Sequence, residues 1–366
     1  MLWITDINFQ AVPDENLKNT AYFKAKSDYT QYMQEINAKT LSMFVYYWKD
    51  ESAASIHARI DGMLAGFHRG DTLIVQLPVY IRPLNIKILI EHIHNEFKGK
   101  VIAMIHDYET LLYGKEKLEF DQTLDPLMDV FHTGTYDVLV PEFDALIVHS
   151  EPFKDALKSR LNYNKPIVVQ GPFGYKIADE IDIPEHKFSR SIVFAGYLAK
   201  AQYLKTIPEG WHLDVFGPMV NEQIKQNPNI TYHGNFSPTE LPYHLPDGFG
   251  LVWASETYPE VTGIAGMYTK INYSHKISAY LTAKLPLIVW SKSAPAKWVV
   301  ENGLGFAVDN LDEITPILDT MTEEKYRYFQ KNLNTMSNLI REGIFEKAAA
   351  LDAYAEINQI SSRTKY

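Results

Sequence analysis

Short apolar runs recur along the chain, and most of them are continuous rather than alternating with polar residues. Strands that are apolar on both faces are typical of parallel sheets covered by helices on each side. Longer amphipathic stretches separate the runs, so strands and helices alternate, which predicts two doubly wound α/β domains. The expected strands are Leu2–Thr5, Leu41–Tyr47, Thr72–Leu77, Val101–Ile105, Ala145–Val148 and Ile167–Val169, then Ser191–Ala195, His212–Phe216, Ile230–Tyr232, Phe249–Trp253, Leu285–Trp290 and Gly305–Val308.

The stretches between and after the strands place most of their apolar residues three or four positions apart, which is the spacing of an amphipathic helix. The first stripe opens at Thr20, a residue type that commonly caps helices. Two more helices are expected after the last strand, with a break at Gly343. The stripes are Tyr22, Ala25, Tyr29, Met33 and Ile36; Ile56, Ile60, Met63, Leu64 and Phe67; Tyr326, Phe329, Leu333, Met336 and Ile340; and Phe345, Leu351, Tyr354 and Ile357.

The length of 366 residues suits two domains, and the hydrophobic share of 46% lets each half bury a core. A Gly/Pro-rich stretch at 171–174 follows the sixth expected strand and predicts the boundary between them. We expect an N-terminal domain over residues 1–171 and a second domain over 172–338. A C-terminal helix over 339–366 should pack back on the first domain.

Composition excludes several classes of function. The formal net charge of -10 disfavours nucleic acid as a partner, because phosphate backbones repel an acidic surface. The chain has no cysteine, which excludes disulfides, Cys-ligated zinc and thiol catalysis. No HExxH or EF-hand pattern is present, and His92 and His94 suit a helix face better than a metal site, so we expect no metal. The N-terminus lacks signal-peptide features and no apolar run approaches about 18 residues, so we expect a cytoplasmic protein that does not span a membrane.

The segment from Tyr268 to Lys276 is a local basic cluster in this acidic chain. It holds Lys270, Asn272, His275 and Lys276, and it precedes a helix-like run at 277–283 and an apolar strand. Backbone N–H groups, the helix dipole and side-chain cations converge where a loop enters a helix, and together they can bind phosphate. No GxGxxG or GxxxxGK[ST] motif follows a strand, so a dinucleotide-type or P-loop site is disfavoured.

Other expected strand ends in the second half carry glycine or lysine. Gly196 and Tyr197 follow one strand, Lys200 comes next, and Gly248 flanks another strand. Ligands of open α/β sheets bind at the carboxyl ends of the strands. For any one lysine a solvated surface charge is the simpler interpretation, whereas three lysines near strand ends or helix starts of one domain favour a phosphate site.

His106 and Asp107 end a strand in the first half. Histidine titrates near neutral pH and can accept a proton from a sugar hydroxyl, and a neighbouring carboxylate can stabilise its charged form. The simpler alternative is a histidine that closes the strand end by hydrogen bonding. Gln76 also ends a strand and could contribute to the same cleft.

Several stretches resemble one family. They are Ile4–Asn8, Ile105–Glu109, Gly248–Trp253 and, most specifically, Tyr268–Trp290. The chain resembles the bacterial GT-B glycosyltransferase family of the serine-rich repeat adhesin glucosyltransferase, whose pattern β-1,6-galactofuranosyltransferases share. The resemblance covers essentially the whole chain and implies two Rossmann-like domains that face each other across a cleft.

The resemblance also implies a site for UDP. Lys270, Asn272, His275 and Lys276 would line it, Lys200 would contact phosphate, and Thr20 would face it from the first helix. Segment 254–267 does not follow the family pattern, which leaves the donor sugar open. Further nucleotide or sugar contacts are expected from Asn8, Gly196, Tyr197, Asn235, Phe236, Gly248 and Glu260.

The implied reaction transfers a hexosyl group, glucose or galactofuranose, from a UDP-sugar to a hydroxyl of a glycan or glycoprotein. It is expected to invert the anomeric centre, to need no metal or other cofactor, and to use His106 assisted by Asp107 as the base. Self-association is expected by analogy with relatives. The alternatives are an enzyme resembling UDP-GlcNAc 2-epimerase, a non-catalytic GT-B partner subunit and a two-lobed sugar-binding protein.

Overall fold

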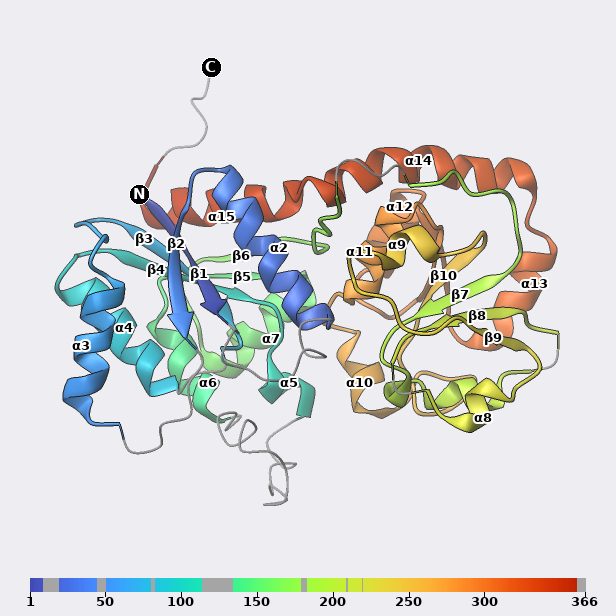
Figure 1. Ribbon diagram of the computed structural model, residues 1–366, viewed down its shortest axis with the longest axis horizontal. Coiled ribbons are helices and arrows are strands. Elements are labelled where there is room, and N and C mark those ends of the chain that lie inside the picture. The colour runs from blue at the N-terminus through green and yellow to red at the C-terminus, as the bar shows by residue number, and fades with distance from the viewer. Residues whose placement is uncertain are drawn as a thin grey trace.

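The computed structural model describes residues 1–8, 20–44, 51–79, 83–113, 134–178, 183–208, 210–218 and 220–360. Its described part contains two six-stranded sheets, one from each half of the chain, and every pairing between neighbouring strands is parallel. Helices flank both sheets (Figure 1). The expected doubly wound α/β class is therefore confirmed.

The first sheet has the strand order β2-β1-β3-β4-β5-β6. β3 and β5 are buried along their whole length, as continuous apolar runs predict. The structure describes β2 only to Phe44, so the last three residues of the expected strand lie outside the described part. The strands are β1 (Leu2–Asn8), β2 (Lys39–Phe44), β3 (Thr72–Leu77), β4 (Lys100–Ile105), β5 (Ala145–Val148) and β6 (Ile167–Val169).

The second sheet has the order β12-β11-β10-β7-β8-β9. All strands run in the same direction, but the order in which successive strands are added reverses between β7 and β10: β8 and β9 lie on one side, β11 and β12 on the other. Such a switch point leaves a crevice at the carboxyl ends of β7 and β10. The second sheet therefore places its ligand crevice beside residues 196 and 253. The strands are β7 (Ile192–Ala195), β8 (Leu213–Phe216), β9 (Ile230–Tyr232), β10 (Phe249–Val252), β11 (Leu287–Trp290) and β12 (Gly305–Val308).

Most helices cover the two sheets, and a few short ones lie between them. α2 begins after its N-cap Thr20, as expected. α10 contacts α5 across the space between the domains. The helices are α2 (Ala21–Glu35), α3 (Ala53–Met63), α4 (Pro83–Asn95), α5 (Glu109–Tyr113), α6 (Gly134–Leu139), α7 (Glu151–Leu161), α8 (Glu222–Lys225), α9 (Leu241–His244), α10 (Gly263–Tyr268), α11 (His275–Thr282), α12 (Ala296–Glu301), α13 (Ile314–Asp319), α14 (Glu323–Arg341) and α15 (Ile344–Ile357).

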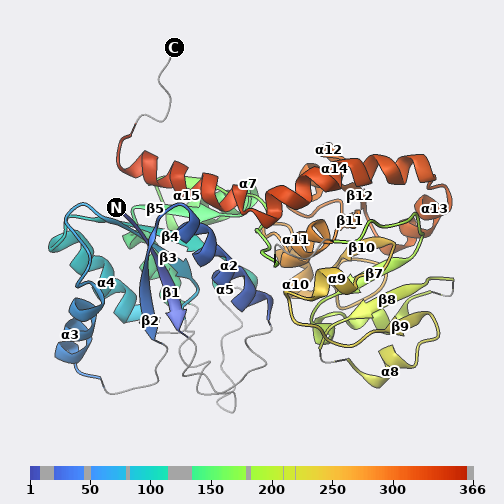
Figure 2. The same ribbon diagram turned by 45° about the horizontal axis from the view of Figure 1, so that its top comes forward.

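α14 and α15 run along one side of both domains (Figures 1 and 2). α14 buries the expected stripe against the second domain. α15 crosses back and contacts β4, β5, β6 and α2, so the last helix packs on the first domain as expected. The exact domain limits at 171 and 338 stay predictions.

α15 forms where the last helix was expected, but its buried face includes residues outside the expected stripe. Ala349, Ala350 and Ala353 pack on the first sheet, whereas Leu351 is 49% exposed. Small side chains let the helix axis approach the strands closely, and the space is filled by Tyr29 and Tyr32 of α2. Within the expected stripe, Phe345 and Ile357 also pack against the hydrophobic clusters, so the stripe predicted the contact face only in part. Within the described ranges, no helix is both long and apolar enough to cross a bilayer.

Candidate functional site

A pocket of about 180 Å³ lies between the two domains at the carboxyl end of β7. Most of its wall comes from the second domain, while two residues come from the start of α2. One more, Tyr175, comes from the segment between β6 and β7, which we call the linker between the domains. We call this pocket the larger pocket. It is lined by Thr20, Ala21, Tyr175, Ala195, Gly196, Tyr197, Phe216, Gly217, Pro218, Asn235, Phe236, Pro238, Leu241, His275, Lys276 and Ala279.

One wall of the larger pocket is aromatic. The ring of Phe216 stacks on His233 with centroids 4.6 Å apart, and Phe236 stacks on His244 at 4.0 Å. His233 is held by Asp214, whose carboxylate lies 2.6 Å from its Nε2. These partners fix the rings, and a rigid aromatic wall is suited to the flat face of a base or sugar.

The other wall of the pocket is cationic. α11 starts at His275, two residues before the expected helix, with Ser274 as its N-cap. Lys276 lies in the first turn, and burial, helped by the charge of Lys200, lowers its pKa to about 8. A Cβ atom on Gly196 would lie 2.5 Å from Lys276 Cε, so glycine at that position leaves room for the lysine. A helix start with a lysine is a suitable site for phosphate.

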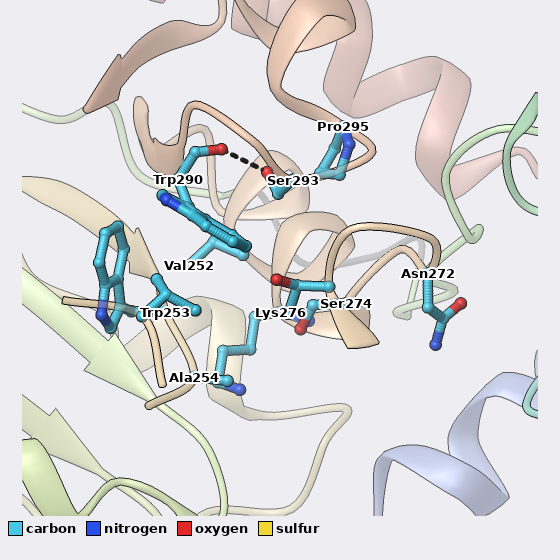
Figure 3. Close-up of a pocket in the computed structure, with 11 residues that line it drawn as sticks. Val252, Trp253, Ala254, Asn272, Ser274, Lys276, Trp290, Ser293 and Pro295 are labelled. Atoms are coloured by element: carbon cyan, nitrogen blue, oxygen red, sulfur yellow. Dashed lines mark hydrogen bonds between the residues drawn. The ribbon is translucent and has the colours of Figure 1, made fainter. Parts of the chain in front are cut away.

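A smaller pocket, of about 20 Å³, lies on the other side of Lys276 (Figure 3). It sits at the carboxyl ends of β10 and β11, and a hydrogen bond of 2.6 Å from Ser293 Oγ to the Trp290 carbonyl fixes its rim. Such a volume holds about one water molecule. It is lined by Val252, Trp253, Ala254, Val261, Thr269, Asn272, Ser274, Lys276, Trp290, Ser293 and Pro295.

The basic segment 268–276 largely contacts the first domain. Tyr268 Oη accepts a hydrogen bond of 3.0 Å from the backbone N–H of Tyr108. Asn272 Nδ2 donates to Asp107 Oδ1 at 3.0 Å, and Ser150 Oγ donates to the carbonyl of Ile271. These contacts join the two domains, so much of the segment lies at the contact between them, and the expected phosphate contacts of Lys270 and Asn272 stay predictions.

Asp107 lies at the centre of this contact between the domains. Burial raises the pKa of its carboxyl group to about 6, although Lys200, Lys26 and the hydrogen bond from Asn272 act in the opposite direction. A carboxylate with this pKa is ionised at neutral pH and can still accept a proton, which suits a general base.

His106 is enclosed, with 3% of its surface exposed. Gln76 Nε2 donates to the Thr5 carbonyl, so Gln76 Oε1 accepts from His106 Nε2, which lies 2.8 Å away. Burial keeps the pKa of His106 well below its ordinary value. The ring lies parallel to Phe173 with centroids 6.0 Å apart and lines neither pocket described above. This geometry fits the alternative of a histidine that closes the strand end.

Of the three remaining candidates from the second domain, one lines the larger pocket and two are exposed lysines. His275 lines the larger pocket and packs on Tyr175, and burial lowers its pKa to about 3. Lys200 is exposed, yet its charge acts on both Asp107 and Lys276. Lys270 is exposed, lies 5.5 Å from the centroid of the Trp290 ring and lines neither pocket.

Of the expected nucleotide or sugar contacts, Thr20, Gly196, Tyr197, Asn235 and Phe236 line the larger pocket. The other three are placed differently. Gly248 has φ +147° and precedes β10, and a Cβ atom there would collide with the backbone of Ser191. It therefore serves strand packing at the amino end of β10, away from the ligand crevice at the carboxyl ends of the strands. Glu260 is exposed and lines neither pocket, and the side chain of Asn8 lies outside the described part.

Two residues near the site were missed in the sequence. Tyr175 of the linker lines the larger pocket, and Lys26 is 4% exposed with its Nζ 3.1 Å from the Gln76 carbonyl. Lys26 stands four residues after Tyr22 and three before Tyr29, which places a lysine on the apolar stripe of α2. That position was the signal that could have identified it. Among the described residues, no group of three His, Cys, Asp or Glu is placed to hold a metal ion.

Comparison with known families identifies the chain. The N-terminal domain model of the glucosyltransferase 3-like family matches residues 1–172, and the C-terminal domain model of the same family matches residues 192–353. The two models together cover nearly the whole chain. The chain belongs to the glucosyltransferase 3-like family.

Named relatives agree with this assignment. A glucosyltransferase 3 of Streptococcus gordonii is 29% identical over 337 residues, which are 91% of this chain and 94% of the relative. The β-1,6-galactofuranosyltransferase WbbI of Escherichia coli K12 is 26% identical over 352 residues, or 94% and 96% of the two chains. As a member of the glucosyltransferase 3-like family, the chain is a glycosyltransferase.

The fold is GT-B. The solved structure of a sucrose-phosphate synthase from Thermosynechococcus elongatus superposes with a TM-score of 0.59 at 11% identity, and the match covers 98% of this chain and 99% of that chain. At that identity the likeness concerns the fold alone. The GT-B arrangement expected from the sequence is therefore confirmed.

Proposed function

We propose that this glycosyltransferase moves a hexosyl group, glucose or galactofuranose, from a UDP-sugar to a hydroxyl of a glycan or glycoprotein. One observation supports this most directly: an aromatic pocket of about 180 Å³ ends at a lysine in the first turn of α11. A uracil nucleoside against the aromatic wall would present its diphosphate to Lys276 and to the N–H groups of the helix start. The predicted cytoplasmic location and self-association are kept as parts of this proposal.

Departure of UDP creates negative charge on the β-phosphate. Lys276 and the α11 dipole lie where that charge would develop, and fixed positive charge at a leaving group lowers the barrier. Lys200, whose charge acts on Lys276, adds to the same field. These groups supply the electrostatic stabilisation without invoking a cofactor.

The donor sugar would lie beside Lys276, at the mouth of the smaller pocket. That pocket is too small for a sugar ring, since its 20 Å³ hold about one water molecule. The ring would therefore remain in the cleft near Asn272 and Asp107, with at most one small substituent in the pocket. This arrangement brings the anomeric carbon to the contact between the domains.

An inverting transfer needs a base on the acceptor side of the anomeric carbon. We propose Asp107 for this role rather than His106, because the Asp107 carboxylate reaches the contact between the domains whereas the imidazole is enclosed. Asp107 would take the proton of the acceptor hydroxyl as the oxygen attacks. His106, bonded to Gln76, would position the strand end that carries the carboxylate.

Two experiments test this function. UDP at about 100 times its dissociation constant should add roughly 2.7 kcal/mol of stability in a thermal-shift assay. UDP-glucose, UDP-galactofuranose and UDP-GlcNAc would be compared with it. If no uridine nucleotide shifts the melting temperature, the proposed donor class is wrong.

The second experiment addresses the base. Asp107→Asn should lower turnover by about 10²- to 10⁴-fold, the usual contribution of a general base, while UDP still binds. His106→Asn is the comparison, and it should lose far less turnover. If His106→Asn loses more turnover than Asp107→Asn, His106 and not Asp107 is the base.

A further inference from the structure

Helix α2 belongs to the first domain, yet its first turn forms part of the larger pocket. Thr20 and Ala21 line that pocket, and Ala25, one turn later, packs in the core of the second domain. The pocket wall is complete only while α2 lies in this place. Something must therefore hold α2 against the second domain.

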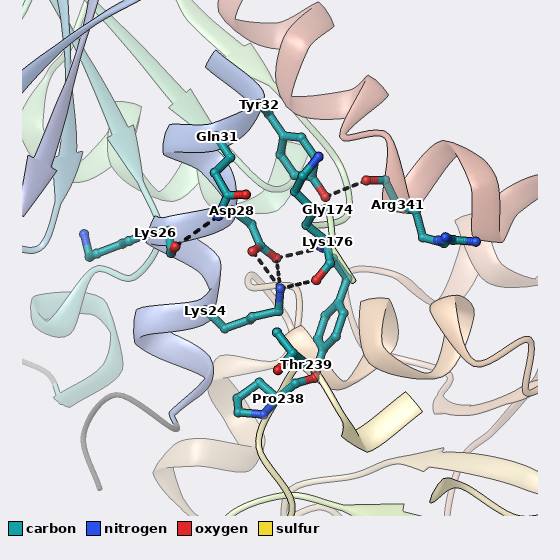
Figure 4. Close-up of polar contacts among 12 residues, drawn as sticks. Lys24, Lys26, Asp28, Gln31, Tyr32, Gly174, Lys176, Pro238, Thr239 and Arg341 are labelled. Carbon is teal, nitrogen blue, oxygen red and sulfur yellow. Dashed lines mark hydrogen bonds and ion pairs between the residues drawn. The ribbon is translucent and has the colours of Figure 1, made fainter. Parts of the chain in front are cut away.

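A buried ion pair attaches α2 to the linker between the domains (Figure 4). Lys24 Nζ lies 2.6 Å from each oxygen of Asp28 and also donates to the backbone carbonyl of Lys176. In return, the backbone N–H of Lys176 donates to Asp28 Oδ2 at 2.8 Å. We call Lys24, Asp28 and the Lys176 backbone the α2 clamp.

The α2 clamp is enclosed. Lys24 is 7% exposed and Asp28 is 2% exposed. Buried charges are tolerated only with well-formed partners, so the helix and linker have little freedom to separate while the pair exists. The clamp therefore fixes the distance between α2 and residue 176.

The linker residue next to the clamp is itself a wall of the larger pocket. Tyr175 lines the pocket, and its hydroxyl donates to the Pro238 carbonyl at 2.5 Å. Lys24 Nζ lies 4.9 Å from the centroid of the Tyr175 ring. Lys24 thus contacts Asp28 of α2, the backbone of the linker and the Tyr175 ring in the pocket wall.

We propose that the α2 clamp positions the nucleotide site: it holds the first turn of α2 and Tyr175 against the larger pocket, so that UDP meets an assembled site. Lys24 and Asp28 are positioning residues that need not touch the ligand. The proposal rests on the function proposed above. A ligand whose binding-competent form is only partly populated binds more weakly in proportion, so the clamp should raise UDP affinity by keeping that form populated.

An ion pair that only stabilises the fold would behave differently. Its loss would lower the melting temperature, but molecules that remain folded would bind UDP as before. The dissociation constant of UDP at a temperature where all variants are folded therefore separates positioning from stability.

The test uses the full chain with Lys24→Met and Asp28→Asn combined, because removing both charges leaves no buried charge without a partner. Isothermal calorimetry would measure the dissociation constant of UDP, and thermal melting would measure stability. If α2 occupies its place in one molecule of ten, the dissociation constant rises about tenfold. Lys24→Gln combined with Asp28→Asn removes both charges but keeps polar groups at both positions; it should give the same direction and serves if the first double variant does not fold.

Asp144→Asn is the matched control. Asp144 accepts from His94 at 2.8 Å and from the backbone N–H of Val101 at 2.8 Å, before β5 and away from the larger pocket. It should lower the melting temperature and leave UDP affinity unchanged. Wild-type affinity in folded clamp variants would overturn the positioning role alone, whereas a wild-type protein that binds no UDP would overturn the proposed function.

Discussion

Gly196→Ala should remove Lys276 from the site while leaving the lysine in the sequence. The added Cβ would lie 2.5 Å from Lys276 Cε, a distance that no carbon can keep, and 3.2 Å from its Nζ, which is a tight contact. Because the collision involves the end of a flexible side chain, the lysine can move away. The fold should therefore tolerate the methyl group, and the ammonium should leave the pocket wall.

The magnitude follows from the contact that is lost. A hydrogen bond to a charged group contributes about 1.5–3 kcal/mol. At about 1.4 kcal/mol for each factor of ten, UDP should bind roughly 10- to 150-fold more weakly. Melting temperature should change little, because the contact that is lost inside the protein is the one between Lys276 Nζ and the Phe194 ring, whose centroid is 5.4 Å away.

Calorimetric titration with UDP is the assay, and Gly62→Ala is the control, since no atom of the described chain lies within 4 Å of a Cβ at that position in α3. Lys276→Met should weaken UDP binding to a similar extent. In the Lys276→Met background, Gly196→Ala should add nothing, because two changes acting through one contact are not additive. Equal UDP affinity in wild type and Gly196→Ala would refute the assignment of Lys276 to the diphosphate.

Two further predictions concern pH. The profile of kcat/KM should be bell-shaped, falling below about pH 6 as Asp107 takes up a proton and above about pH 8 as Lys276 loses one. Stopped assays from pH 5 to 9 measure this profile. If the fall below pH 6 persists in Asp107→Asn, Asp107 is not the base. Glu346 is 3% exposed, and burial raises its pKa from 4.5 to about 8, so the folded chain holds a proton that the unfolded chain releases. Glu346 should therefore contribute a fall in the free energy of unfolding of roughly 1.4 kcal/mol per pH unit between those values. Glu346→Gln should flatten that slope in urea titrations, and an unchanged slope would show that another group is responsible.

The pattern of apolar runs was sufficient to predict both sheets. Strands such as β3 and β5 are buried on both faces, so their sequences carry a signal that does not depend on which neighbour covers them. The N-cap at Thr20 could also be predicted from nearby residues, since its side chain accepts a hydrogen bond from the backbone N–H of Phe23, three residues further along the chain. Features set within a few residues of one another were therefore predicted correctly.

The face of α15 shows what periodicity alone misses. Leu351 fits a helical stripe but is 49% exposed, whereas Ala349, Ala350 and Ala353 pack in one cluster with Tyr29 and Tyr32. Which stripe is buried depends on the space left by α2, more than 300 residues earlier in the chain. That information is absent from any local window of sequence.

By itself, the sequence determined that two parallel α/β domains form, that the chain carries a basic segment leading into α11, and which family it resembles. Only the tertiary structure decided where the side chains of this segment lie. Lys276 lines both pockets, whereas Asn272 crosses to Asp107 and Lys270 remains exposed. The physical reason is that a side chain's partner depends on which strand end of the other domain lies opposite it. Neighbours along the chain therefore acquire different roles.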